Sequence, residues 1–398
     1  MKLLFTSKLD TIYQIRVFIL WLFAVLLPFP ILNGMNIPLM ALSLVWLIEW
    51  KKNIAYIKTN IYKVIAFAIP FWLAIIGLIN TTDHATANIQ IGEQFLFFVF
   101  SVLLLGSYPL KNQDLHFILK GFILSVFISC LLAFGKGLFF LYEYKTNLFY
   151  YSYFQHLSKI HTTYFSMYLV FAIALTLYYI LKERNLYRVL VAILVLLCYG
   201  ITLYIQASRI AIISLAGVIT ILVITQKIPI KIKLPVGILI VVSSFLILTT
   251  PNFQKRFKSF ENDKNNEFMF RIKLWETAIK SVSSRKNLFL GNGTGDAKNY
   301  LVKDYKTEKN TIAYKAKYNA HNQYIEFYIR NGLLGVLMVL LPIIYLLFIS
   351  IKYKNIPLVL CLTIILITMM TESILQRVHG IMFVAYFLGL FSKHFKIV

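Results

Sequence analysis

Residues 321–350 read HNQYIEFYIRNGLLGVLMVLLPIIYLLFIS, and their pattern is the most informative in the chain about its fold. Its second half is almost wholly apolar, and its first proline is Pro342. A continuous helix of this length would be about 45 Å long, whereas the hydrocarbon core of a bilayer is about 30 Å thick. We therefore expect a membrane-spanning helix whose first turns stand outside the bilayer.

The whole chain shares this apolar character. Of its 398 residues, 59% are hydrophobic and 14% are charged, and the mean hydropathy is +0.73. A soluble chain is about 45–50% apolar and about 25% charged. The basic residues are scattered between apolar runs and do not gather on one face, which argues against nucleic acid as a partner. The composition instead indicates a protein that is embedded in a lipid bilayer.

Twelve stretches are apolar and long enough to cross a membrane as helices. They lie at 13–31, 34–50, 61–80, 91–108, 115–142, 163–181, 188–206, 210–226, 234–250, 330–350, 356–371 and 378–392. The sequence thus predicts an all-α integral membrane protein. We expect about nine spans in a membrane domain at 1–250, a loop domain at 251–330, and about three spans in a membrane domain at 331–398.

The chain has a net charge of +24, and its basic residues are unequally distributed between the two predicted sides of the membrane. If the N-terminus is cytoplasmic, 19 of the 40 Lys and Arg fall in inside segments, five in short outside segments, and 16 in residues 251–330. Short loops obey the positive-inside rule, from which long loops are exempt. We therefore expect both termini in the cytoplasm and one large outward loop, which carries 16 basic and 8 acidic residues.

Within this loop, Glu267 to Val282 predicts an amphipathic helix, because apolar residues recur near the helical period. Those residues are Phe268, Ile272, Trp275, Ile279 and Val282.

Arg271 is the notable charge on this helix. It shares a side with Leu274, Trp275 and Ala278, at offsets of three, four and seven, so its guanidinium emerges beside an apolar surface. Position alone leaves two interpretations. Arg271 either binds a ligand, or it packs its aliphatic part at the edge of the apolar surface and keeps its charge in water.

The segment Gly291-Asn-Gly-Thr-Gly295 follows. Its spacing differs from the glycine pattern of nucleotide-binding loops, and it lies on the outward side. We predict a tight turn that needs the backbone freedom of glycine.

His321 begins the long run quoted above. A continuous helix from this point places His321 outside the membrane beside a helix N-terminus, whose free N–H groups suit an anionic ligand. Gly332 and Gly335 would let a neighbouring helix approach closely where the run enters the bilayer.

Arg209 stands between two apolar spans, at the outer surface, with almost no loop on either side. Ionisable residues at such positions are candidates for function. The alternative is simple anchoring at the lipid headgroups.

Other polar and aromatic clusters are less informative. The remaining histidines lack a metal-ligand spacing or a nearby acidic cluster, so we expect no metal. The tyrosine-rich stretch 147–154 is typical of an aromatic belt at the membrane interface, although such a stretch could also line a groove for sugar or lipid.

The motif at the end of the loop resembles that of the O-antigen ligase and polymerase family of bacterial envelope enzymes. His321-Asn322, nine residues, Gly332, two residues and Gly335 resemble the family's His-Asn-x9-Gly-x-x-Gly signature.

The two arginines extend the resemblance. Arg209, which follows Ala-Ser, is similar to the family's outer-surface arginine. Arg271, with its aromatic neighbour and the later glycine-rich turn, is similar to the family's loop pattern. One departure is Leu290 before Gly291, without the proline that the family pattern has a few residues earlier; this affects the shape of the turn.

The resemblance implies a GT-C-like architecture, in which the periplasmic loop contains short helices, and a place in the bacterial inner membrane. It implies a glycosyltransferase of lipopolysaccharide biosynthesis that takes a glycan from undecaprenyl diphosphate and passes it to lipid A-core or to a second lipid-linked glycan. His321 would be the catalytic base, Arg209 and Arg271 would hold the diphosphate, and Asn322, Gly332 and Gly335 would support the motif. Neither a metal nor another cofactor is expected.

Several alternatives remain open at this level. The motifs do not separate a ligase from a polymerase or from an enzyme that glycosylates proteins. Twelve spans with both termini inside also suit a transporter or flippase for lipid-linked glycan, but such proteins place their site near the midplane, commonly between repeated halves. The chain shows no internal repeat, and its outlying polar residues gather at one face.

Overall fold

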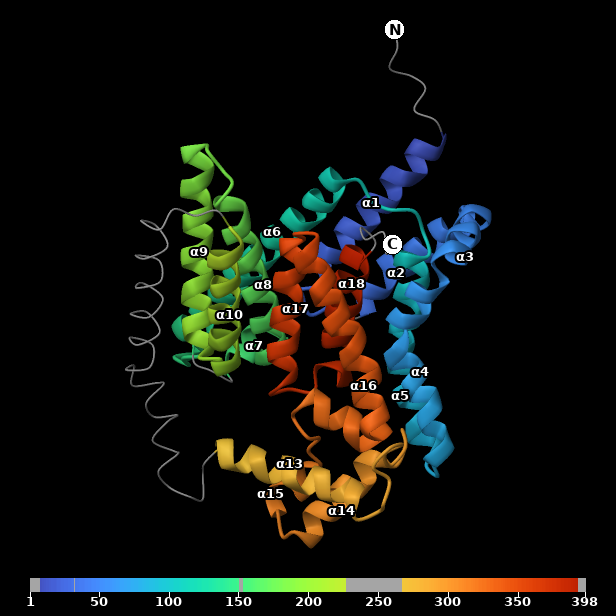
Figure 1. Cartoon of the computed structure of the whole chain (residues 1–398). Coiled ribbons are helices and arrows are strands. Elements are labelled where there is room, and N and C mark those ends of the chain that lie inside the picture. Colours follow the sequence, from blue (N-terminus) through green and yellow to red (C-terminus); the bar gives the residue numbers. More distant parts are fainter. Residues whose placement is uncertain (1–7, 32, 150–152, 227–266, 393–398) are drawn as a thin grey trace. The chain divides into compact units, whose positions relative to one another are not determined.

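The computed structural model of the chain describes residues 8–31, 33–149, 153–226 and 267–392 (Figure 1). Within these ranges every regular element is a helix. The chain separates into two compact units, each built from discontinuous segments. Of the described residues, the first unit comprises 8–31, 33–67, 98–149, 153–208 and 382–392, and the second comprises 68–97, 209–226 and 267–381.

The first unit contains most of the N-terminal helices. They are α1 (Lys8–Leu26), η1 (Asn33–Met35), α2 (Asn36–Ile48), α3 (Trp50–Phe67), η3 (Ser101–Leu105), α6 (Asn112–Tyr144), α7 (Phe154–Ser158), α8 (Thr162–Ile180) and α9 (Leu186–Gln206). Most of α18 (Val378–Ser392) also belongs here. Its core is aromatic: the ring centroid of Phe387 lies 4.9 Å from those of both Phe122 and Phe171.

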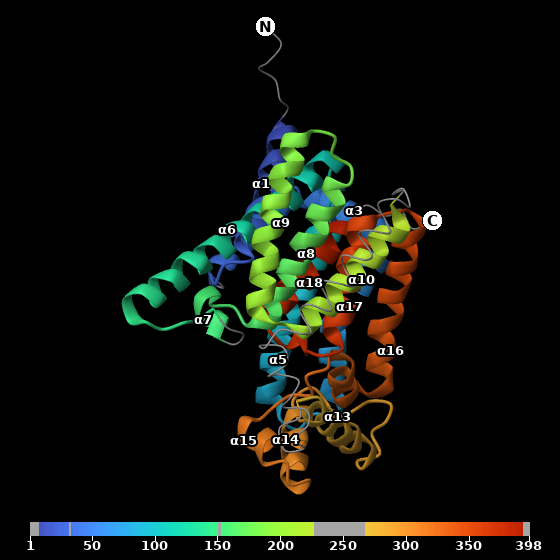
Figure 2. The same ribbon diagram turned by 90° about the vertical axis from the view of Figure 1, so that its left-hand side faces the viewer.

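The second unit contains the remaining elements (Figure 2). They are α4 (Ile69–Ile76), η2 (Gly77–Asn80), most of α5 (His84–Phe100), α10 (Arg209–Thr225), α13 (Glu267–Ser283), α14 (Ala297–Thr307), α15 (Thr311–Ala316), α16 (Gln323–Lys352), α17 (Ile356–Met369) and η5 (Ile374–Gln376). In this unit α16 packs against α4, α13 and α17, and α10 packs along α17.

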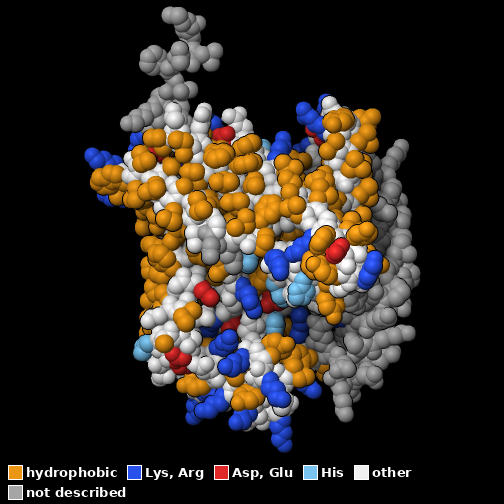
Figure 3. Space-filling view, turned by 180° about the vertical axis from the view of Figure 1, so that it is seen from behind, with side chains coloured by type: hydrophobic (Ala, Val, Ile, Leu, Met, Phe, Trp, Pro, Cys, Tyr) orange, Lys and Arg blue, Asp and Glu red, His pale blue; other side chains and the backbone are white. Residues whose placement is uncertain are grey.

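Five of the described helical segments are long and apolar enough to cross a membrane. They are His84–Leu105, Asn112–Tyr144, Thr162–Ile180, Leu186–Gln206 and Gln323–Lys352. A sixth results if α3 and the helix that follows it count as one interrupted span, and five further apolar helices are shorter. Apolar side chains also cover much of the surface drawn in Figure 3.

The described part of the chain is therefore all-helical, and its several long apolar helices are those of a multi-pass membrane protein. The count of twelve spans and the side on which each loop lies stay predictions. The predicted span at 234–250 lies outside the described residues.

The expected helices in 251–330 are present as α13, α14 and α15, which share a small apolar core. Leu274, Ala278 and Val282 line one face of α13 because they recur at helical spacing, and all three are fully buried. The predicted stripe is wrong at Ile279, which is 47% exposed, because the helix packs through the face that carries the small Ala278. Burial raises the pKa of the Tyr305 phenol in the same core.

The helix quoted at the start of the sequence analysis is interrupted, so the expectation of a continuous run to Pro342 is wrong. Gly332 has φ 62° and ψ −159°, a backbone conformation that breaks the helix, whereas Pro342 lies inside α16 without ending it. An interruption leaves backbone N–H and C=O groups of the helix without their usual partners.

The turn that follows α13 supplies those partners. Leu333 N–H donates to the carbonyl of Leu288 at 2.8 Å, and Leu334 N–H donates to that of Phe289 at 3.2 Å. In the other direction, the carbonyls of Ile329 and Arg330 accept from backbone N–H groups of residues 292 and 293, at 2.7 and 3.0 Å.

The role predicted for Gly332 and Gly335 also changes. A Cβ at Gly332 would overlap the carbonyl of Phe289, so this glycine admits a loop, not a neighbouring helix. A Cβ at Gly335 would meet Asn331 of its own helix. The close approach expected at this motif therefore exists at Gly332, but its partner is the glycine-rich turn.

Candidate functional site

The segment that joins α17 to α18, residues 370–377, is held in place by side chains from other parts of the second unit. Asn322 Nδ2 donates to the carbonyl of Met370 at 3.0 Å. Arg271 Nη1, from α13, donates to the carbonyl of Thr371 at 2.8 Å. Two of the residues singled out from the sequence therefore bind adjacent peptides of this segment.

Further contacts fix the second half of the segment. Gln323 Oε1 accepts from the N–H of Leu375 at 2.7 Å, and Gln94 Nε2 donates to the carbonyl of Leu375 at 2.7 Å. Arg330 donates to the side-chain oxygen of Gln376. Since Gln323 and Arg330 both belong to α16, the segment is tied to the helix that follows His321.

His321 lies two residues before α16 and faces this segment. Its Nδ1 is 3.3 Å from Oε1 of Glu372, an ion-pair contact when the histidine is protonated. The ring of Tyr318 packs edge-on against the imidazole, with centroids 5.3 Å apart. The backbone of His321 is left-handed, with φ 45°, and its N–H donates to Oδ1 of Asn319 at 3.1 Å.

The N-cap of the helix is Asn322, which corrects the expectation that His321 opens it. Asn322 Oδ1 accepts from the N–H groups of Tyr324 and Ile325, at 3.0 and 3.2 Å. Because this side chain occupies two of the N–H groups that start the helix, they do not supply the anion site that the sequence suggested.

Glu372 is the residue that sequence reasoning missed. It is 8% exposed, and it belongs to none of the motifs that the sequence offers. One signal was available: like Arg209, Glu372 is an ionisable residue that directly follows an apolar span.

The peptide before His321 is fixed from both sides. Trp275 Nε1, on α13, donates to the carbonyl of Ala320 at 3.0 Å. Oε2 of Glu326 accepts from the N–H of Ala320 at 3.3 Å. The predicted aromatic neighbour of Arg271 therefore positions the backbone that carries the histidine.

Arg209 begins α10, which runs antiparallel to α17 (Figure 1). A Cβ at Gly217 of α10 would lie 3.0 Å from Cδ1 of Ile367. Arg209 is two turns earlier along α10, so it lies towards the end of α17 that leads into residues 370–377. His321 and Glu372 are thus in contact, and Arg271 binds the carbonyl of Thr371, the residue just before Glu372. Arg209 lies at the same end of the α10–α17 pair.

The glycine-rich turn is confirmed as a tight turn, with φ 69° at Gly291 and 86° at Gly293. Beyond it, Thr294 Oγ1 donates to the carbonyl of Ala74 at 2.8 Å, which ties the turn to α4. Nearby, hydrogen bonds from the backbone and hydroxyl of Thr86 hold the pKa of Asp83 below its usual value. The turn is thus bonded to α4 on one side and to the residues before and after the break in α16 on the other.

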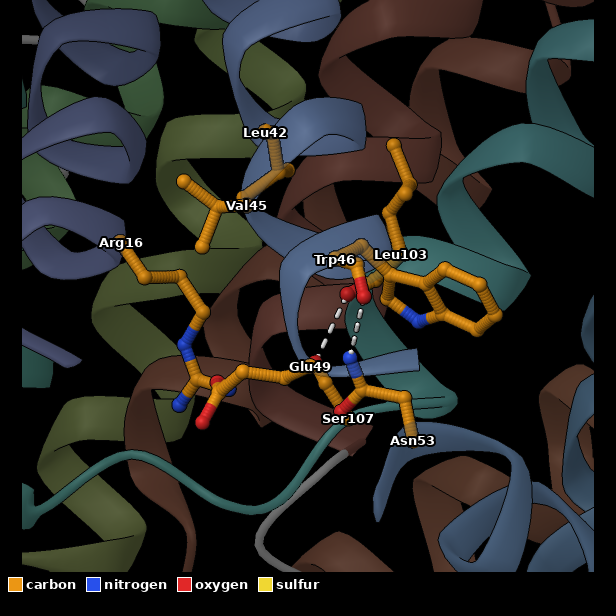
Figure 4. A pocket seen from close by; sticks show the side chains of 8 residues that line it. All are labelled: Arg16, Leu42, Val45, Trp46, Glu49, Asn53, Leu103 and Ser107. Atoms are coloured by element: carbon orange, nitrogen blue, oxygen red, sulfur yellow. Dashed lines mark hydrogen bonds between the residues drawn. The ribbon is translucent and has the colours of Figure 1, made fainter. Parts of the chain in front are cut away.

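A second buried polar cluster lies in the first unit (Figure 4). Arg16 is 3% exposed and lies over the ring of Tyr108, 4.4 Å from its centroid, and it donates to the Tyr108 carbonyl at 3.0 Å. Glu49 accepts from the hydroxyl of Tyr108 at 2.9 Å. None of the residues predicted for the site takes part in this cluster.

The site in the second unit combines a histidine, a carboxylate beside it, and a permanently charged guanidinium. Such a set can accept a proton and hold an anion. Among the described residues, no three His, Cys, Asp or Glu side chains gather as a metal-binding group would.

Comparison with known families gives a match in the central part of the chain. Residues 192–340 match the model of the O-antigen ligase family. This segment belongs to that family. The O-antigen ligase segment includes Arg209, Arg271 and the whole His321–Gly335 motif, whereas Glu372 lies beyond it.

One curated relative extends the similarity beyond the O-antigen ligase segment. An uncharacterized protein of Haemophilus influenzae is 23% identical over 335 residues, which covers 79% of each chain.

Proposed function

We propose that this protein is an O-antigen ligase-like glycosyltransferase of the bacterial inner membrane. It would move a glycan from undecaprenyl diphosphate to a periplasmic acceptor, which we assign as lipid A-core. The observation that carries the proposal is the His321–Glu372 pair, 3.3 Å apart, beside the Arg271-bound peptide, in a chain with an O-antigen ligase segment.

His321 acts as the base in this proposal. Its Nδ1 faces the carboxylate of Glu372, which fixes the orientation of the ring and leaves Nε2 to accept a proton from the attacking hydroxyl. The carboxylate also stabilises the imidazolium that forms. The base is thus held by two elements, since His321 precedes α16 and Glu372 follows α17.

The two arginines bind the leaving group. Cleavage of the sugar–diphosphate bond places negative charge on the diphosphate, and a guanidinium offers paired N–H donors for phosphate oxygens. The arginines stabilise the transition state, in which this charge develops, more than they stabilise the ground state. This difference accelerates the reaction. A pair of arginines would therefore replace a metal ion in this role.

The acceptor hydroxyl attacks the sugar carbon on the face opposite the diphosphate. The new glycosidic bond forms as the bond to the diphosphate breaks, the hydroxyl proton passes to His321, and the anomeric centre inverts. An enzyme that used a second lipid-linked glycan as acceptor, a polymerase, would use the same groups.

The test is reconstitution of the purified protein in vesicles with a glycan on undecaprenyl diphosphate. We expect glycan on lipid A-core and release of undecaprenyl diphosphate only when both substrates are present. Product on a second lipid-linked glycan alone would make the protein a polymerase. Passage of intact donor across the bilayer without transfer would make it a flippase and overturn the proposal.

A further inference from the structure

Three consecutive apolar residues project from the turn that fills the break in α16. Leu288, Phe289 and Leu290 are 45%, 70% and 43% exposed. Soluble surfaces rarely present such a run, and a contiguous apolar patch on an exposed loop commonly marks an interaction site. The O-antigen ligase chemistry proposed above assigns no role to these side chains.

The patch continues the apolar surface of α16. Backbone hydrogen bonds join Leu288 and Phe289 to Leu333 and Leu334, whose side chains are 45% and 41% exposed. Further along the same helix, Leu337 and Leu341 are 44% and 59% exposed. The helix α16 is a candidate membrane span, and most residues of its most apolar part lie outside the protein core. This surface therefore faces lipid.

The length of α16 beyond its break gives the depth of the patch. The part from Leu333 to Lys352 measures about 30 Å at 1.5 Å per residue, which equals the thickness of the hydrocarbon core. Lys352, in the last turn, then lies at one boundary, and Leu333 lies at the other. The residues paired with Leu333 and Leu334 are therefore at the boundary between hydrocarbon and headgroups.

The flanking residue fits the same location. Lys286 is exposed two positions before Leu288 and has a left-handed backbone, with φ 57°. Basic residues next to an apolar run suit the phosphate layer above the hydrocarbon.

We propose that Leu288, Phe289 and Leu290 insert into the hydrocarbon boundary of the bilayer and anchor the helical unit α13–α15 to the membrane surface. The occupant of the patch is lipid. Because the anchor is bonded to α16 on one side and follows α13 on the other, it holds the height of α13, which carries Arg271, relative to the lipid headgroups. The inference does not depend on which glycan is transferred.

Site-directed spin labelling tests this proposal in vesicles of the intact protein. The label is placed at Phe289→Cys, with Ile312→Cys as a matched control, since Ile312 is 61% exposed on α15. Both variants carry Cys198→Ala, so that the label attaches at the introduced cysteine. The other two cysteines, Cys130 and Cys361, are fully buried and stay in place. The measurement is relaxation of the label by oxygen, which enters lipid, and by a polar nickel complex, which remains in water.

We expect the label at position 289 to be relaxed at least several-fold more by oxygen than by the nickel complex, and the label at position 312 to show the reverse. Equal access of the nickel complex to both positions would place the patch in water and overturn the proposal. Low access of both agents at position 289 would indicate a protein partner or a second copy of the chain, and it would overturn the proposal too. No substrate is present, so the outcome is independent of glycan transfer.

Discussion

His321 adopts a left-handed backbone conformation, with φ 45°, which is uncommon for residues other than glycine. Such a conformation persists only where the surroundings hold it. Here Asn319 accepts the N–H of His321, Asn322 caps the following helix, and Trp275 and Glu326 bind the preceding peptide. The imidazole is thus directed at Glu372 by a dense set of hydrogen bonds.

We predict that Glu372→Gln lowers kcat by about 10- to 100-fold while the KM for the acceptor changes little. The reason is that the amide does not stabilise a protonated His321 as the carboxylate does. Steady-state transfer in vesicles measures both constants. Glu276→Gln, an exposed acidic position on α13, is the control and should retain full activity. An unchanged kcat in Glu372→Gln would remove the carboxylate from the mechanism.

Arg271 gives a second prediction. Arg271→Lys keeps the charge but loses the planar fork, so transfer should fall by about 10- to 100-fold. The comparison is with Lys273→Ala, which removes an exposed charge from the same helix. If the two variants transfer equally well, Arg271 is an arginine at an apolar edge, as the alternative interpretation from sequence holds.

The residues of the site were predictable from the sequence only in part. His321 and Arg271 carry local signals, a motif and a charge beside an apolar stripe. Glu372 lies 51 positions after His321, and the pairing of these two residues depends on how α17 returns the chain to the start of α16. No local pattern records such a contact.

Among the elements, α16 shows the clearest difference between expectation and structure. Its apolar pattern predicts a helix, and glycine inside a membrane helix is usually tolerated. The break at Gly332 arises from a tertiary contact, since the turn at residues 288–293 bonds to both sides of it. The extents of α13 and α18, by contrast, were predicted closely, α13 from its helical periodicity and α18 from the length of its apolar stretch.

Gly332→Ala tests the importance of this break. The backbone at φ 62° and ψ −159° is essentially restricted to glycine, so we expect a loss of about 1–3 kcal/mol in the free energy of unfolding, with a further loss from overlap with Phe289. Thermal unfolding in detergent measures the change. Gly92→Ala is the control, because its added Cβ meets no atom within 4 Å. Equal midpoints for the two variants would contradict the described turn.

For the whole molecule, the composition indicated a membrane protein, and the apolar stretches predicted that it is all-helical. The sequence could not predict the two units, because residues 68–97 join the described residues of 209–381 through contacts between distant segments. The predicted sides of the membrane rest on the Lys and Arg outside residues 251–330, of which 19 fall in inside segments and five in short outside segments.

Membrane-impermeant thiol reagents test these sides in whole cells. In the Cys198→Ala background, Lys315→Cys on α15 should react in cells with a permeable outer membrane, whereas Lys354→Cys after α16 should react only after the inner membrane is opened; both positions are exposed. The reverse pattern would invert the predicted orientation and place the site in the cytoplasm.

His321 serves as the base in the proposed glycan transfer. The most direct measurement compares wild type, His321→Ala and His84→Ala in vesicles that hold lipid-linked glycan and lipid A-core, with His84 chosen as an exposed histidine of the same unit. We predict that His84→Ala transfers glycan at the wild-type rate and that His321→Ala, folded to the same extent, is slower by about 100-fold or more. Transfer by His321→Ala at the wild-type rate would contradict the account.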